Sequence, residues 1–179
     1  MIRLKTIKPI VALADEKPQP TPEHMEITVE ILEDKFEEYN KLYFGGRLMW
    51  PDELYLFGSF RCYGRFSCNK HAPGARLRNV RIGISMYYDW TEEHLRNVLV
   101  HEMLHYKLER GKNPPKKMHG PRFLKAAAEM NEKYGLNIDV HPRLDGLKVS
   151  TSAPKHSLAR FFYAPPSEDS RRQKENVSV

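Results

Sequence analysis

The sequence predicts an α+β domain in which helices pack on a small antiparallel sheet of about three strands. Two observations lead to this class. Apolar residues recur every three or four positions in three long segments, and they take strand-like spacing in a shorter central stretch. The length of 179 residues suits one folded domain with tails. We therefore expect an N-terminal extension over 1–20, one domain over 21–140 and a partly disordered C-terminal tail over 141–179.

The first helix is predicted to begin at Thr21 and to end at Gly45. Thr21 offers a hydroxyl N-cap, and Pro22 and Glu23 suit the first turn. Gly45 and Gly46 readily adopt the left-handed conformation that ends many helices. Between these limits the spacing of apolar side chains predicts one buried face, formed by Val29, Leu32, Phe36, Tyr39 and Tyr43.

The central stretch from residue 54 to residue 85 predicts the strands. Its apolar residues stand among turn residues or alternate with polar ones: Leu54, Leu56, Phe60, Tyr63, Phe66, Val80, Ile82 and Ile84. Pro73 and Gly74 lie in the segment between 70 and 78, which predicts a loop between two of the strands. These strands form the sheet that the helices are expected to cover.

The two remaining helices are joined by a short basic loop. Thr91, which two glutamates follow, predicts the start of the first of them, and Gly111 and Pro114 predict its end. Pro121 and Gly135 mark the limits of the second. Each helix carries an apolar stripe, so each is expected to bury one face.

The composition narrows the expected partners and compartment. The net charge of +6 favours anionic partners such as nucleic acid, although a solvated basic surface accounts for it equally well. No apolar run approaches the ~20 residues that span a bilayer, and the patch from Ile10 to Leu13 is too short for a signal peptide. Cys62 and Cys68 make no disulfide framework of the secreted type. We expect a cytoplasmic protein without a membrane partner; a monomer is favoured, although the sequence leaves the oligomeric state open.

The sharpest chemical signal is the pentapeptide His101-Glu102-Met103-Leu104-His105. Histidines four positions apart lie on one face of a helix, so their imidazoles can converge on one metal ion. Zn²⁺ prefers neutral imidazole nitrogens in a tetrahedral array. Glu102 would lie beside the metal, where it can take a proton from an attacking water. The motif therefore predicts zinc held by His101 and His105, with Glu102 as the general base.

A catalytic zinc site needs a third protein ligand, for which three residues are candidates. His119 follows the motif helix across a turn, so a helix–loop–helix hairpin would fold it back over His105. Glu129 lies deeper in the next helix, the position used by zinc proteases with a glutamate ligand. His94 precedes His101 by about 10 Å along the helix axis, which is too far for the two to share the metal. The spacing leaves both His119 and Glu129 open.

Three segments occur in a characteristic order: Tyr39-Asn40-Lys41-Leu42-Tyr43-Phe44-Gly45-Gly46-Arg47-Leu48, then Val80-Arg81-Ile82-Gly83-Ile84-Ser85, then the pentapeptide followed by His119-Gly120-Pro121-Arg122-Phe123. Together they resemble the SprT-like zinc-dependent metalloproteases, which include the Spartan DNA–protein crosslink proteases. The resemblance covers roughly Ile27 to Ile138. It implies a zincin-like metalloprotease fold, and it implies that the third zinc ligand is His119.

The resemblance also implies an activity. The expected protein is a zinc-dependent metalloendopeptidase that hydrolyses peptide bonds of a protein or peptide substrate through a zinc-activated water. DNA-associated or crosslinked proteins are the expected substrates, and DNA–protein crosslink repair is the expected process. The basic residues Arg76, Arg78 and Arg81 support DNA as a further partner. The alternative is a non-catalytic, zinc-containing module that binds nucleic acid or protein.

Two points stay open. Many relatives add a cysteine-based zinc ribbon, but a chain with only Cys62 and Cys68 cannot build a four-cysteine site. A Cys–His site that includes His71 is an alternative to reading both cysteines as ordinary small residues. The donor that would stabilise an oxyanion is unassigned, and the candidates are Tyr106, Arg122 and Tyr134.

Overall fold

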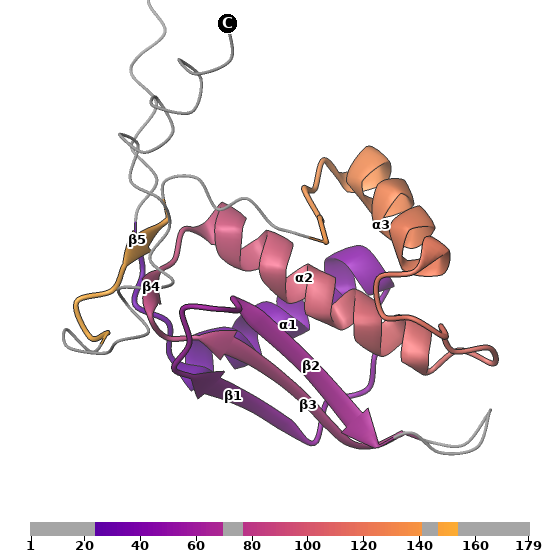
Figure 1. Cartoon of the computed structure of the whole chain (residues 1–179), viewed down its shortest axis with the longest axis horizontal. Helices are drawn as coiled ribbons and strands as arrows, with labels where there is room; N and C mark the ends of the chain where they lie inside the picture. The colour runs from indigo at the N-terminus through magenta and orange to yellow at the C-terminus, as the bar shows by residue number, and fades with distance from the viewer. Residues whose placement is uncertain (1–23, 70–76, 141–146, 154–179) are drawn as a thin grey trace, which may run out of the picture.

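A computed structural model describes residues 24–69, 77–140 and 147–153. Its elements, in chain order, are α1 (Val29–Phe44), β1 (Glu53–Phe57), β2 (Gly64–Asn69), β3 (Arg78–Ser85), β4 (Tyr88–Asp89), α2 (Glu92–Glu109), α3 (Pro121–Tyr134) and β5 (Lys148–Val149). Helices α1 and α2 pack against the sheet of β1, β2 and β3, and α3 packs on α2 (Figure 1). The predicted α+β class is confirmed. The predicted extension over 1–20 and most of the predicted tail lie outside the described residues.

The three-stranded sheet is mixed, so the prediction of an antiparallel sheet is wrong in part. Its order is β1-β3-β2, with β2 antiparallel and β1 parallel to β3. The chain reverses direction between β1 and β2 and again between β2 and β3. These two reversals leave β3 running in the same direction as β1. Because β3 inserts between the other two strands, it pairs with β1 as a parallel neighbour. Val80, Ile82 and Ile84 are at most 3% exposed, so the strand richest in buried apolar residues takes the central position.

Helix α1 begins later than predicted. Its N-cap is Thr28, whose side-chain hydroxyl accepts a hydrogen bond from the backbone N–H of Ile31 at 3.3 Å. The preceding residues cannot be helical, because Met25 pairs with Trp90 in an antiparallel bridge through bonds of 2.7 and 3.1 Å. The predicted start at Thr21 is therefore wrong, since a tertiary pairing prevails over a local capping signal. The predicted end is confirmed, because Gly45 caps the helix with a φ of 64°.

A second, two-stranded sheet closes one end of the domain. Strand β5 pairs antiparallel with β4, and Leu147 and Ala153 on either side of it are buried. This segment lies within the stretch assigned from sequence to the tail. Strands of two residues are too short to show a period, so the pattern carried no signal for them.

Helix α2 is the centre of the domain, between the sheet, α1 and α3. The side chain of Thr91 caps its start, as predicted, by accepting a hydrogen bond from the backbone N–H of His94 at 3.2 Å. Most of its side chains are buried, including the polar residues His101, Glu102 and His105. In the described part of the chain, no helix combines the length and apolar character needed to cross a membrane.

Candidate active site

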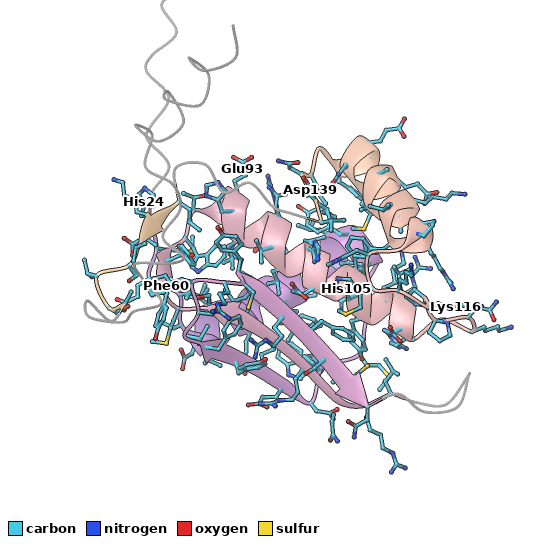
Figure 2. All side chains as sticks on the ribbon, in the orientation of Figure 1. His24, Phe60, Glu93, His105, Lys116 and Asp139 are labelled. Carbon is cyan, nitrogen blue, oxygen red and sulfur yellow. The ribbon has the colours of Figure 1, made fainter. Side chains whose placement is uncertain are left out.

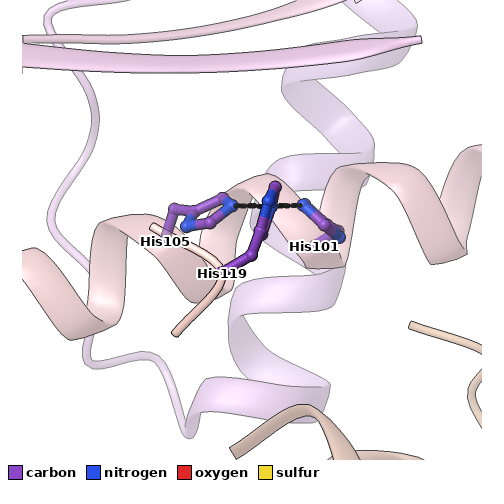
Figure 3. Close-up of side chains that lie close together, drawn as sticks. All are labelled: His101, His105 and His119. Atoms are coloured by element: carbon purple, nitrogen blue, oxygen red, sulfur yellow. Dashed lines mark hydrogen bonds between the residues drawn. The ribbon is translucent and has the colours of Figure 1, made fainter. Parts of the chain in front are cut away.

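The structure brings three histidines together from two segments. His101 and His105 lie one turn apart on the same face of α2, and His119 reaches them from the loop that precedes α3 (Figure 3). Their Nε2 atoms form a nearly equilateral triangle: His101 to His105 is 3.1 Å, His101 to His119 is 3.1 Å and His105 to His119 is 3.0 Å. The pair expected from the pentapeptide thus gains a third imidazole of the same chemistry.

This donor set fits a metal ion. Tetrahedral zinc bonded to nitrogen at 2.0–2.1 Å separates its ligand atoms by about 3.3 Å, close to the edges of the observed triangle. Burial lowers the pKa of His101 to about 4 and that of His105 to about 3, and the neighbouring histidines add to the shift. Both imidazoles are therefore neutral at pH 7, with lone pairs available for a metal. The three histidines could hold a metal ion.

Phe123 supports all three imidazoles. This fully buried residue of α3 has its ring centroid 4.8 Å from that of His101, 4.4 Å from that of His105 and 5.0 Å from that of His119. Phe123 lies in the first turn of α3, directly after the loop that carries His119. The docking of α3 on α2 therefore positions both His119 and the ring that supports it. On the sheet side, Phe66 stacks on His105 with 6.2 Å between centroids. Packing of this kind restricts the rotamers of the ligands before any metal binds.

Glu102 lies beside the histidines and is only 7% exposed. Burial raises the pKa of its carboxyl to about 8, and the charge of Arg65 and a hydrogen bond from the backbone of Phe66 partly oppose the shift. A carboxyl with a pKa near neutrality can both accept and release a proton at physiological pH. The position and the burial of Glu102 therefore suit a general base.

A cavity of about 350 Å³ opens onto these groups. We call it the active-site cavity; its lining residues include Arg61, Cys62, Tyr63, Gly64, Asn97, His101, Glu102, His119, Asn137 and Asp139. Sequence reasoning missed Asn97, Asn137 and Asp139. A signal existed only for Asn97, which stands one helical turn before His101 and so shares its face. The other two reach the cavity through the tertiary fold.

The alternative metal ligands lie elsewhere. Glu129 is exposed on α3, and among the described residues the group that could hold a metal contains neither Glu129 nor His94. His71, the proposed partner of Cys68 in a Cys–His site, lies outside the described residues.

The three candidates for an oxyanion donor do not line the active-site cavity. Tyr106 is 3% exposed and stacks on Phe66, with 6.1 Å between ring centroids. Tyr134 packs edge-on against Tyr43 at 5.2 Å. Arg122 is exposed near Gly111. Tyr106 and Tyr134 serve packing in this structure.

Gly64 is required by the close approach of β2 to α2. A Cβ atom at this position would lie 2.6 Å from Oε1 of Glu102 and 2.8 Å from Cγ1 of Val98. We expect Gly64→Ala to lower the free energy of unfolding by about 1–3 kcal/mol, as overpacking generally does. Chemical denaturation of the metal-free protein measures this loss. Combining the change with Glu102→Ala, which removes one of the clashing side chains, should recover part of the loss; strictly additive effects would contradict this account.

A central helix that presents two histidines and a buried carboxylate to one cavity, with a third histidine closing the group, defines a metalloprotease-like domain. Comparison with protein-family models gives a match to the SprT-like family over residues 32–142. The chain belongs to the SprT-like family, which confirms the resemblance seen in its three ordered segments. A search of curated proteins finds no match.

Proposed function

We propose that this protein is a zinc-dependent metalloendopeptidase of SprT-like type, with a zincin-like active site, that cleaves DNA-associated or crosslinked proteins. The observation that carries the proposal is the convergence of three Nε2 atoms within 3.0–3.1 Å of one another beside the buried carboxyl of Glu102. Family membership supports the class of domain. His101, His105 and His119 are the proposed zinc ligands.

The proposed chemistry divides the work between the metal and Glu102. Zinc, when bound, supplies Lewis acidity that lowers the pKa of a water from 15.7 toward about 7 and polarises the scissile carbonyl. Glu102 removes a proton from the attacking water and then delivers it to the nitrogen of the leaving amine. Its side chain is buried close against Gly64 at the start of β2, so it needs little reorganisation to act.

The sheet offers a way to position a peptide. Within the described residues β2 is an edge strand, paired with β3 on one side, and Gly64 at its start lines the active-site cavity. An extended peptide can add to such an edge through main-chain hydrogen bonds, which are largely independent of sequence. This mode of binding suits a protease that acts on unfolded polypeptide of varied sequence.

Nucleic acid is proposed as a second partner. The net charge of +6 supports it, and so does a hollow of about 260 Å³ near the C-terminal end of α2 that Arg47, Lys107 and Arg110 line. Cations grouped in this way can contact phosphates, and such contacts weaken as salt is added. A DNA molecule held there would bring proteins bound to it close to the enzyme.

The zinc-loaded protein should cleave a dye-labelled, unfolded polypeptide, and a zinc chelator should abolish the cleavage reversibly. In a second arm, a DNA-binding protein is offered with and without DNA at two salt concentrations; we expect DNA to accelerate its cleavage, more strongly at low salt. Salt-dependent DNA binding without cleavage of either substrate would overturn the peptidase proposal and favour the non-catalytic binding module.

A further inference from the structure

One wall of the active-site cavity is a short extended segment after α3. We call residues 136–139 (Leu136-Asn137-Ile138-Asp139) the strap. Leu136 and Ile138 are 7% and 4% exposed, while Asn137 and Asp139 are exposed and line the cavity. Asp139 lies in the space between α2 and α3 (Figure 2). Alternate side chains of the strap are therefore buried in the core, and the side chains between them line the active-site cavity.

Two consecutive backbone positions of the strap are tied to helix side chains. The N–H of Asn137 donates to Oδ1 of Asn97 at 3.0 Å. The N–H of Ile138 donates to Oδ1 of Asn131 at 2.8 Å, and Nδ2 of Asn131 donates to the carbonyl of Ile138 at 3.0 Å. Asp139, the next residue, lines the active-site cavity together with His101, and an interaction of its backbone partly opposes the fall in the pKa of that imidazole. The strap is thus fixed to both α2 and α3, and its last residue lines the same cavity as a proposed metal ligand.

We propose that Asn131 is a positioning residue for the metal centre: by clamping Ile138 it holds the strap so that the backbone of Asp139 orients the imidazole of His101. This inference rests on the proposed function, because it assigns His101 as a zinc ligand. With Nε2 of His101 turned to the other histidines, Nδ1 is the nitrogen left for the Asp139 backbone. A partner on that nitrogen sets the tautomer and ring orientation of a metal-binding histidine.

The chemistry of asparagine suits this task. Its side-chain amide carries one acceptor and one donor, which match the N–H and C=O of a single backbone residue as a neighbouring strand would. A two-point contact fixes the orientation of the peptide as well as its position. Because Asp139 directly follows the clamped residue, a shift of Ile138 would move the Asp139 backbone away from its proposed place at His101.

The same clamp occurs a second time in the chain, away from the metal centre. Asn40 on α1 donates from Nδ2 to the carbonyl of Leu48 at 2.9 Å and accepts from the N–H of Leu48 at 3.1 Å. In both helices the backbone carbonyl of the asparagine also accepts the N–H of the glycine that caps the helix, Gly45 or Gly135. Leu48 does not line the active-site cavity. Asn40 is therefore a matched control for Asn131.

The test compares Asn131→Ala with Asn40→Ala in the full chain. Each variant loses the same pair of hydrogen bonds, so both should show a comparable drop in the thermal unfolding midpoint without metal. Zinc affinity, measured by competition with a chromophoric chelator, should fall about 10-fold or more for Asn131→Ala alone, the range expected when an outer partner of a metal ligand is lost. Equal zinc affinity in the two variants would overturn the inference, and so would absence of zinc binding by the unmodified protein.

A second variant covers the case in which Asn131→Ala does not fold. Asn97→Ala removes the single bond to Asn137 and loosens the same strap from α2, so it should also weaken zinc binding relative to Asn40→Ala; unchanged affinity would count against the strap. Zinc affinity is measured without substrate, which separates the two proposals. A protein that binds zinc through this network but cleaves nothing would refute the peptidase function alone. If the protein cleaves its substrate but Asn131→Ala binds zinc as tightly as Asn40→Ala, the positioning role alone is refuted.

Discussion

Glu102→Gln should bind as much zinc as the unmodified protein and hydrolyse peptide bonds at least about 100-fold more slowly, the lower end of what general-base catalysis contributes. Glutamine keeps the shape of the side chain but cannot accept a proton from water. Burial already raises the pKa of Glu102 to about 8 and so favours its uncharged form, which means that a neutral amide should be tolerated at this position. Elemental analysis gives the zinc content, and the labelled unfolded polypeptide gives the rate.

The control for this change is Glu109→Gln. Glu109 lies on the same helix, is 9% exposed and does not line the active-site cavity, so its replacement tests the cost of changing a buried glutamate on α2. It should retain both zinc and turnover. Undiminished hydrolysis by Glu102→Gln would remove Glu102 from the mechanism, and loss of zinc from that variant would assign it to the metal shell instead.

His119→Ala should lose zinc to a chelator far more readily than the unmodified protein, by more than the roughly 10–100-fold that follows the loss of an outer partner. His119 supplies one of the three Nε2 atoms, at 3.1 Å from that of His101 and 3.0 Å from that of His105. Without it, two histidines on α2 remain, fewer protein ligands than catalytic zinc sites use. Its side chain is exposed, so the loss should not come from unfolding.

Glu129→Ala is the matched variant, because Glu129 is the other third ligand that the sequence allowed. This residue is exposed on α3 and stands outside the group of histidines, so its replacement should leave zinc affinity unchanged. The reverse pattern, with zinc lost from Glu129→Ala and kept by His119→Ala, would require a different metal site and would contradict the geometry of Figure 3.

Much of the chain could be predicted from local patterns, since these depend on contacts within a few residues. Thr91, Gly45 and Gly135 mark helix limits because caps act on the nearest backbone groups. His101 and His105 share a face because the helical period alone places residues four apart together. The ordered family segments added His119, which the spacing by itself could not separate from Glu129.

Other features depend on segments that are distant in the sequence. The bridge between Met25 and Trp90 delays the start of α1, and the insertion of β3 between its neighbours makes the sheet mixed. Neither leaves a local signal, because strand order and pairing partners are chosen by the packing of the whole core.

The sequence by itself determined the α+β class, the histidine pair on a helix, the glutamate between them and the family. Only the tertiary structure decided that His119 meets that pair, that Phe123 supports the three rings, and that Asn97 and Asn131 hold a strap that lines the active-site cavity. The physical reason is the distance along the chain over which each kind of interaction acts. Helical spacing and capping act over one turn, whereas the cavity is made by loops and helix faces that meet only when the apolar core closes around α2.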